Sequence, residues 1–332
     1  MTDLSIIIVS YKGYERLRQC LDSLMKLSGT LFNSEVIVVN NCPGDDLFSS
    51  IASHYTGFRF VSNKINGGYA HGCNFGVSLA SGSYILILNP DTVVTENALF
   101  ELLSVARSNT SFIITSCRQV TETGKQSIAW GPFPELNSFT GFMRALCRTG
   151  YKNQIRHKEG FPAEIFFPDW ISGSVVMISA ENYKRIGGFD EDFWMYFEDV
   201  DLCRRVRNTG GDIAFCNHIT IEHNHGGSSR INKKTSSVTK AEVVISRHIY
   251  INKHKKGIER FIIQCFLVTN TLISFGFTAL AGMLFFFIPK LFLRTIIYGK
   301  IIEYYLFAVI RGTWLSPRSV NYLKTPALKT VK

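Results

Sequence analysis

Short apolar runs alternate with amphipathic stretches along the first half of the chain. We expect strands where the runs are rich in β-branched residues, at 4–10, 35–40, 58–62 and 84–89. We expect helices where apolar residues recur at helical spacing, at 15–26, 69–79 and, after a Thr95 cap, up to about residue 106. This alternation predicts an α/β fold in which helices cover both faces of a parallel sheet. Ligands in such folds collect at the carboxyl ends of the strands.

The middle of the chain has no clean periodicity. Residues 117–167 are aromatic and interrupted by Gly and Pro, which is typical of a long insertion at a binding site rather than of core. A strand is predicted to resume at 170–178, followed by a short helix at 180–186 that ends at Gly187 and Gly188.

The last hundred residues differ from the rest in charge. Residues 1–229 carry 19 Lys or Arg against 23 Asp or Glu, whereas residues 230–332 carry 17 against 3. An acidic body joined to a basic, apolar end fits the anionic leaflet of a membrane better than it fits DNA. We therefore expect a membrane partner and no nucleic acid, with an α/β domain at 1–229 and a helical membrane-associating region at 230–332.

Residues 261–288 form an uncharged run of 28 residues, which is long enough to cross a bilayer. A single crossing would separate the basic stretch before it from Arg311 and Lys324 after it, against the positive-inside tendency. A re-entrant hairpin bending near Gly276, or two crossings, removes that conflict. Residues 291–310 predict a helix lying in the membrane interface. The alternative is a buried helical bundle of a soluble fold.

The cysteines and the N-terminus indicate the compartment. The eight cysteines form no C-x-x-C pair and lie mostly among apolar residues, which is typical of buried thiols in a reducing compartment. The short apolar run at 4–9 follows Asp3 without a basic leader, so we expect no cleavable signal and a cytoplasmic body.

A carboxylate follows the fourth predicted strand. The sequence NPDT places Asn89 and Asp91 at the ligand edge of the sheet, in a turn that the proline helps to fix. A lone carboxylate there could hold Mg²⁺ or Mn²⁺ together with diphosphate oxygens and water. A plain turn aspartate is the alternative, and the motif alone favours it. Farther on, His223 and His225 could each be a further metal ligand or an ordinary loop histidine.

A Gly- and Asn-rich loop at 63–76 runs into a helix. Its backbone N–H groups could approach a phosphate or a sugar, and Asn66, Gly67 and Asn74 lie in it. The loop is not a dinucleotide fingerprint, because Tyr69 stands where that motif requires Gly. A tight structural turn is an equally open alternative.

Three acids begin a predicted helix that has a basic end. Glu198, Asp199 and Asp201 lie at its positive terminus, which alone accounts for them structurally. They also follow an aromatic run at 193–197, and an apolar wall there would raise a carboxyl pKa toward that of a general base.

Together these segments resemble the family-2 glycosyltransferases, most closely the bacterial rhamnosyltransferase-like branch. The resemblance covers residues 5 to about 229 and is carried, in order, by SIIIVSYKG, NKINGGYAHGCNFG, ILILNPDT and WISGSVVMISAENYKRIGGFDEDFWMYFEDVDLCRRVRNTGG. It implies that residues 1–229 form a GT-A catalytic domain, with a Rossmann-like sheet that binds a nucleotide sugar. It also implies inverting transfer of the sugar from a nucleotide diphosphate donor, with a divalent cation, Mg²⁺ or Mn²⁺, as cofactor.

The resemblance further implies roles for individual residues. Asp199 would be the general base that removes the proton of the acceptor hydroxyl, and Glu198 would orient it or bind the acceptor. Asp91 would bind the cation, with His223 or His225 beside it. Trp170 and Gly173 would border the acceptor. The donor would contact Ser10, Tyr11, Asn40, Asn66, Gly67, Asn74, Asn89 and Asp91.

One position departs from the family pattern. The family usually has Asp after the second strand, whereas this chain has Asn40, which can hydrogen-bond a base but supplies no charge. We expect transfer of L-rhamnose from dTDP-L-rhamnose onto a polyprenyl-diphosphate-linked glycan, in surface polysaccharide synthesis at the cytoplasmic face of the bacterial inner membrane. The alternatives are galactofuranose or N-acetylglucosamine from a uridine diphosphate donor, or an inactive scaffold in a membrane assembly complex.

Overall fold

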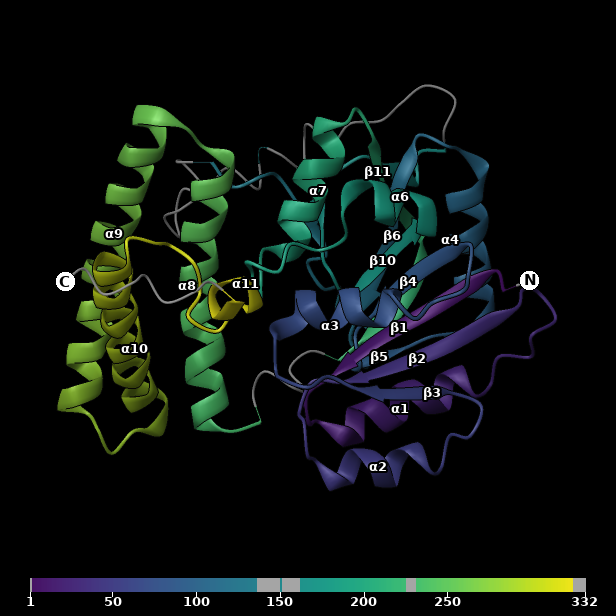
Figure 1. Cartoon of the computed structure of the whole chain (residues 1–332), viewed down its shortest axis with the longest axis horizontal. Helices are drawn as coiled ribbons and strands as arrows, with labels where there is room; N and C mark the ends of the chain where they lie inside the picture. The colour runs from purple at the N-terminus through teal and green to yellow at the C-terminus, as the bar shows by residue number, and fades with distance from the viewer. Residues whose placement is uncertain (1, 136–149, 151–161, 225–230, 325–332) are drawn as a thin grey trace.

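The computed structural model describes residues 2–135, 150, 162–224 and 231–324. A sheet covered by helices forms the N-terminal part, and three long helices, α8 to α10, stand beside it (Figure 1). The sheet strands are β1 (Leu4–Ser10), β2 (Ser34–Asn40), β3 (Arg59–Ser62), β4 (Tyr84–Leu88), β5 (Thr92–Val93), β6 (Phe112–Val120), β8 (Ile165–Phe166), β10 (Val175–Ser179) and β11 (Asp212–His223).

The sheet is mixed rather than parallel, which corrects the expectation from sequence. Its order is β3-β2-β1-β4-β10-β6-β11-β5, with β8 pairing off this path to β11. Strands β1 to β4 are parallel to one another, but β10 runs antiparallel to both β4 and β6. Because β10 is reversed, its start meets the carboxyl ends of β1 and β4 at one edge of the sheet.

Two apolar layers explain why the strands read as continuous hydrophobic runs. Ile6 and Ile8 pack on one face beneath α1 (Tyr14–Leu24), α2 (Asp46–Ala52) and α4 (Glu96–Ser108). Ile7 and Val9 pack on the other face beneath α3 (Gly68–Val77), α6 (Ala180–Ile186) and α7 (Glu198–Asn208). Alternate residues of one strand point to opposite faces, so a strand covered on both sides is apolar at every position.

Two expectations for the middle of the chain need correction. Residues 117–120 are not insertion but the end of the central strand β6, and residues 136–149 and 151–161 lie outside the described part. The strand expected at 170–178 is two strands. A short β9 (Trp170–Ile171) pairs with β7 (Trp130–Gly131), and the chain then turns at 172–174 before β10. A hydrogen bond from Asn89 N–H to the carbonyl oxygen of Ser174, 2.9 Å long, joins this turn to the end of β4.

The C-terminal helices are α8 (Lys233–His254), α9 (Gly257–Leu284), α10 (Pro289–Arg311) and the short α11 (Val320–Lys324). The bend expected near Gly276 is wrong, because α9 continues through this residue, which packs against the Tyr298 ring of α10. The chain instead reverses at 285–288, and Pro289 begins α10 as a first-turn proline. The expected helix at 291–310 corresponds to α10.

Helices α9 and α10 leave much of their apolar surface uncovered. Among the described residues, α9 is the helix long and apolar enough to cross a membrane, and only 22% of its most apolar window is buried. Phe277 is 73% exposed on α9, Phe286 68% at the reversal and Val309 82% on α10. An exposed apolar surface of this extent marks an interaction site for an apolar partner.

Candidate active site

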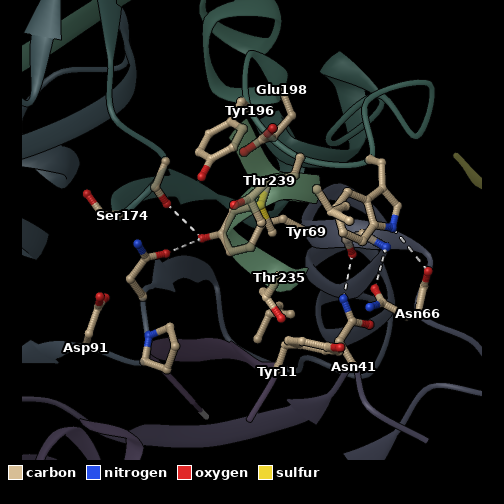
Figure 2. A pocket seen from close by; sticks show the side chains of 18 of the residues that line it. Tyr11, Asn41, Asn66, Tyr69, Asp91, Ser174, Tyr196, Glu198, Thr235 and Thr239 are labelled. Atoms are coloured by element: carbon tan, nitrogen blue, oxygen red, sulfur yellow. Dashed lines mark hydrogen bonds between the residues drawn. The ribbon is translucent and has the colours of Figure 1, made fainter. Parts of the chain in front are cut away.

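A cavity of about 640 Å³ opens at the edge of the sheet where β1 and β4 end and β10 begins. The walls of the α/β part come from the loops after β1, β2, β3 and β4, the turn before β10, the segment leading into α7 and the end of β11. The cavity brings together eight of the residues predicted from sequence: Tyr11, Asn66, Asn89, Asp91, Gly173, Glu198, Asp199 and His223. Figure 2 labels Tyr11, Asn66, Asp91 and Glu198 among them.

Strand pairing brings Asp91 and His223 together across 132 positions of sequence. In the antiparallel pair of β5 and β11, His223 lies opposite Thr92, so its ring reaches the preceding aspartate. His223 Nε2 is 3.1 Å from Asp91 Oδ1, and His223 Nδ1 is 2.7 Å from Gln119 Oε1. Since a carbonyl oxygen only accepts, Nδ1 carries a proton, and Nε2 is the ring nitrogen that faces the carboxylate.

This pair fits a divalent cation. Nε2 and the carboxylate oxygen, 3.1 Å apart, attract one another when a proton or a cation lies between them. Gln119 fixes the tautomer in the way that outer partners fix metal-binding histidines. No group of three His, Cys, Asp or Glu side chains converges among the described residues, so a hard cation here would complete its shell with diphosphate oxygens and water. His225, the other histidine predicted as a ligand, lies outside the described residues.

A pair of acids, Glu198 and Asp199, lies at the start of α7, after two strained residues. Tyr196 and Phe197 have φ angles of 70° and 66°, in the left-handed region of the backbone that residues other than glycine rarely adopt. This backbone turns Glu198 and Asp199 toward the cavity (Figure 2 shows Glu198). Asp199 Oδ2 accepts from Gly173 N–H and Asp199 Oδ1 accepts from Val200 N–H, both at 2.8 Å.

The two carboxyls differ in their pKa values for physical reasons. Burial raises the pKa of Glu198 well above its usual value, and repulsion from Asp199 raises it further. Glu198 Oε2 has no hydrogen-bond partner in the described part of the chain. Burial also raises the pKa of Asp199, but the N–H donors of Gly173 and Val200 oppose that rise. Asp199 therefore ionises first, and Glu198 retains its proton beside it.

The third acid of the motif does not reach the cavity. The Asp201 carboxylate is 1% exposed and accepts from Arg205 Nε at 2.7 Å, and His254 Nε2 lies 2.8 Å from its other oxygen. Burial alone would raise the Asp201 pKa, but His254 and Arg205 outweigh burial and lower it. Asp201 thus ties α7 to the end of α8.

A series of hydrogen bonds links the Asp91–His223 pair to the two acids at the start of α7. Asn89 Nδ2 is 3.4 Å from His223 Nε2, and the Tyr69 hydroxyl is 3.0 Å from Asn89 Oδ1. The same hydroxyl is 2.9 Å from the carbonyl oxygen of Gly173, whose N–H holds Asp199. Tyr69, drawn at the centre of Figure 2, therefore fixes the spacing between the Asp91–His223 pair and the two carboxyls of α7.

Five predicted residues lie elsewhere. The Asn40 side chain accepts from Cys42 N–H at 2.8 Å and bonds Ser62, so it shapes the turn after β2. Asn74 is saturated by Tyr183, Glu191 and both backbone polar groups of Phe189. The remaining three, which also do not line the cavity, are Ser10, Gly67 and Trp170.

Several lining residues were not predicted from sequence. Asn41 lies beside Asn40 but is the one that reaches the cavity, where its amide holds Gly68 O at 2.7 Å. Trp194 belongs to the aromatic run before the acids, which was the available signal for it. Lys234 and Arg318 come from the C-terminal region, which was predicted to be a basic, membrane-associating segment rather than part of the site.

Comparison with known proteins gives family matches over the α/β domain. The model described as glycosyl transferase family 2 matches residues 5–161, and the one described as N-terminal domain of galactosyltransferase matches residues 166–226. The low-salt glycan biosynthesis hexosyltransferase Agl10 of Haloferax volcanii is 28% identical over 68% of this chain and 68% of its own. The rhamnosyltransferase WbbL of Escherichia coli is 28% identical over 62% of this chain and 77% of its own.

Two further similarities bear on chemistry and fold. The N-acetylglucosaminyl-diphospho-decaprenol L-rhamnosyltransferase of Mycobacterium tuberculosis is 24% identical, over 63% of this chain and 72% of its own. The solved structure of GalNAc-T7 with UDP, GalNAc and Mn²⁺ superposes with a TM-score of 0.53 at 13% identity. That match covers 77% of this chain and about half, 52%, of the other, and it concerns the fold alone.

Proposed function

Because this chain belongs to the family-2 glycosyltransferases, in the rhamnosyltransferase-like branch and with a GT-A fold, we propose that it transfers L-rhamnose from dTDP-L-rhamnose onto a polyprenyl-diphosphate-linked glycan. The reaction is inverting and takes place at the cytoplasmic face of the bacterial inner membrane, during synthesis of a surface polysaccharide.

One observation carries this proposal: two side chains suited to bind a cation and two carboxyls, one of them suited to act as a general base, face a single cavity. Asp91 and His223 converge at one side, and Glu198 and Asp199 line the same space. A donor diphosphate at the first pair and an acceptor hydroxyl at the second would bring the reacting atoms together, which is the main source of rate in a two-substrate transfer. Retention of both pairs argues against an inactive scaffold.

The chemistry assigned to the side chains follows from their protonation. The Asp199 carboxylate accepts the proton of the acceptor hydroxyl as that oxygen attacks the anomeric carbon from the side opposite the diphosphate. The bond between the anomeric carbon and the diphosphate oxygen breaks, and its electron pair leaves with the diphosphate. Glu198, which keeps its proton, can donate a hydrogen bond to an acceptor oxygen. Gly173 N–H holds Asp199 in position throughout.

Asp91 and His223 would hold the divalent cation, Mg²⁺ or Mn²⁺. When bound there, the cation supplies positive charge that stabilises the leaving diphosphate. Asn89 and Tyr69 keep the cation ligands at a fixed spacing from Asp199 through their hydrogen bonds.

The acceptor assignment is supported by the exposed helices. The apolar surface of α9 and α10, together with the basic character of residues 230–332, suits an anionic lipid surface. An enzyme that sits on the surface carrying its acceptor gains effective concentration. The relatives include one named for an acceptor on decaprenyl diphosphate.

The test is transfer from a panel of nucleotide sugars onto a short polyprenyl diphosphate N-acetylglucosamine, with Mg²⁺, with Mn²⁺ and with chelator. We expect metal-dependent product from dTDP-L-rhamnose. Product from uridine diphosphate galactofuranose or N-acetylglucosamine instead would replace the donor assignment. No product together with no nucleotide binding by calorimetry would favour the scaffold.

A further inference from the structure

Part of the cavity wall comes from the C-terminal helices rather than from the catalytic domain. The first turns of α8 and the segment between α10 and α11 contribute Lys234, Thr235 and Arg318 to the lining. Figure 2 shows Thr235 among the side chains around the cavity. In the described part of the chain, no ion pair joins Lys234 or Arg318 to Asp91 or Asp199, and Arg318 pairs instead with Glu242. Two cations therefore face this space without an acid of the active site to neutralise them.

Arg318 is held in place by a buried acid, Glu242, which does not line the cavity. Arg318 Nη1 donates to Glu242 Oε1 at 2.9 Å, and the Ser316 hydroxyl donates to the same oxygen at 2.9 Å. The Glu242 side chain is fully buried, whereas that of Arg318 is 34% exposed. The described residues offer no other partner to the guanidinium, so its remaining N–H groups stay available at the cavity. A guanidinium fixed at one nitrogen is pre-oriented to grip a phosphate with the others.

The segment that carries Arg318 is anchored to the catalytic domain. Ser316, Ser319 and Val320 are buried, and Val320 packs against the loop at Gly67. Asn321 Nδ2 donates to Asp192 Oδ1 at 2.9 Å. The cation at 318 is therefore a fixed part of the cavity wall rather than a member of a loose basic tail.

We propose that Lys234 and Arg318 form an anion subsite that binds the diphosphate of the lipid-linked acceptor. The inference rests on the proposed function, because it assigns a position to the acceptor of that reaction. The position favours the acceptor over the donor for two reasons. The donor diphosphate is accounted for by Asp91 and His223 in the catalytic domain. The two cations belong to the helical unit whose outer surface is apolar, so they lie between the sugar-accepting cavity and the lipid-facing helices.

The subsite is tested with two soluble acceptors that differ in charge: citronellyl diphosphate N-acetylglucosamine and the neutral octyl glycoside of the same sugar. We compare the full-length wild type with Lys234→Gln, Arg318→Gln and Arg318→Lys. The last variant keeps the ion pair with buried Glu242 but removes the second N–H arm, so it separates phosphate binding from folding. Lys240→Gln is the matched control, because Lys240 is an exposed lysine of α8 outside the cavity.

We expect each cavity variant to raise KM for the diphosphate acceptor about 10-fold or more, as the loss of a charge-assisted hydrogen bond predicts. KM for the neutral acceptor, the Kd of dTDP with Mn²⁺ and the control should stay unchanged. An equal loss of dTDP affinity would place the donor diphosphate at these cations and overturn the proposal, as would an unchanged KM.

Binding of citronellyl diphosphate itself, measured by calorimetry, keeps the subsite separate from the proposed function. If the wild type glycosylates neither acceptor, the proposed function fails. Loss of citronellyl diphosphate binding in Arg318→Lys would still support the subsite, and equal binding by wild type and variant would reject it.

Discussion

Replacing Asp199 by Asn tests the division of roles between the two acids that begin α7. The exchange removes the base but keeps the shape of the side chain. General-base catalysis contributes about 10²–10⁴-fold, so kcat should fall by that factor. The loss corresponds to roughly 3–5 kcal/mol in the barrier. The new amide group must also face one of two backbone N–H donors that now lie 2.8 Å from carboxylate oxygens, which costs about 1–3 kcal/mol of stability.

Glu198→Gln is the matched control. Burial and repulsion from Asp199 raise the pKa of Glu198, which favours the uncharged form of the wild-type side chain, and Gln imitates that form. We expect kcat within about tenfold of wild type. The acid limb of the pH profile should stay in place, because it reports ionisation of Asp199, whose pKa lies above 3.8.

Stability should separate the two variants as well. An acid with a raised pKa in the folded state binds more protons folded than unfolded, so wild-type stability falls as pH rises above about 4.5. Glu198→Gln removes that dependence and should melt higher than wild type at pH 7.5, with the difference shrinking toward pH 4.

The kinetic comparison of the two variants is made by single-turnover transfer, with dTDP affinity measured in parallel. If Glu198→Gln were as inactive as Asp199→Asn while dTDP affinity held, the assignment of Asp199 as the base would be refuted.

Three other perturbations probe the cation ligands, the helix packing and the membrane surface. Asp91→Asn should raise the calorimetric Kd of dTDP in Mn²⁺ by about 10–100-fold, and wild-type affinity that survives chelator would contradict a metal role. Gly282→Ala places a Cβ against the carbonyl oxygen of Leu291 and should cost about 1–3 kcal/mol in detergent melts, whereas Gly299→Ala meets nothing within 4 Å. Equal melting of the two variants would argue against this α9–α10 packing. Phe286→Glu should weaken vesicle flotation by about 1.5–3 kcal/mol without changing turnover of a soluble acceptor, and undiminished flotation would place the membrane surface elsewhere.

Local patterns in the sequence predicted where strands and helices lie along the chain better than how those elements pair and pack with one another. The run at 4–10 and the helix after Thr95 follow from short-range apolar spacing and a capping side chain, and both are present. The antiparallel direction of β10 did not follow, because strand direction depends on connections that periodicity does not record. The bend was predicted at Gly276, a glycine near the middle of the apolar run, yet the chain reverses before Pro289, where a proline is tolerated at a helix start.

The site residues also fall into two groups: those that the sequence could predict and those that depend on the tertiary fold. Asp91 and Asp199 were candidates from their positions at a strand end and a helix start, the family resemblance supplied their roles, and both line the cavity. Asn40 was placed in the site by its position in the family pattern, but its side chain is consumed by the turn after β2. Arg318 could not be found, because only the tertiary return of the chain after α10 brings it to a cavity formed by the first 224 residues and α8.

The stereochemistry of the new glycosidic bond tests the central claim most directly. Full-length protein in vesicles would be given dTDP-β-L-rhamnose, ¹³C-labelled at the anomeric carbon, and lipid-linked acceptor, and the product would be read by NMR. A single base opposite the leaving diphosphate permits only direct displacement, so the account predicts an α-linked product whose formation requires the divalent cation. A β-linked product, or equal product in the presence of chelator, would contradict it.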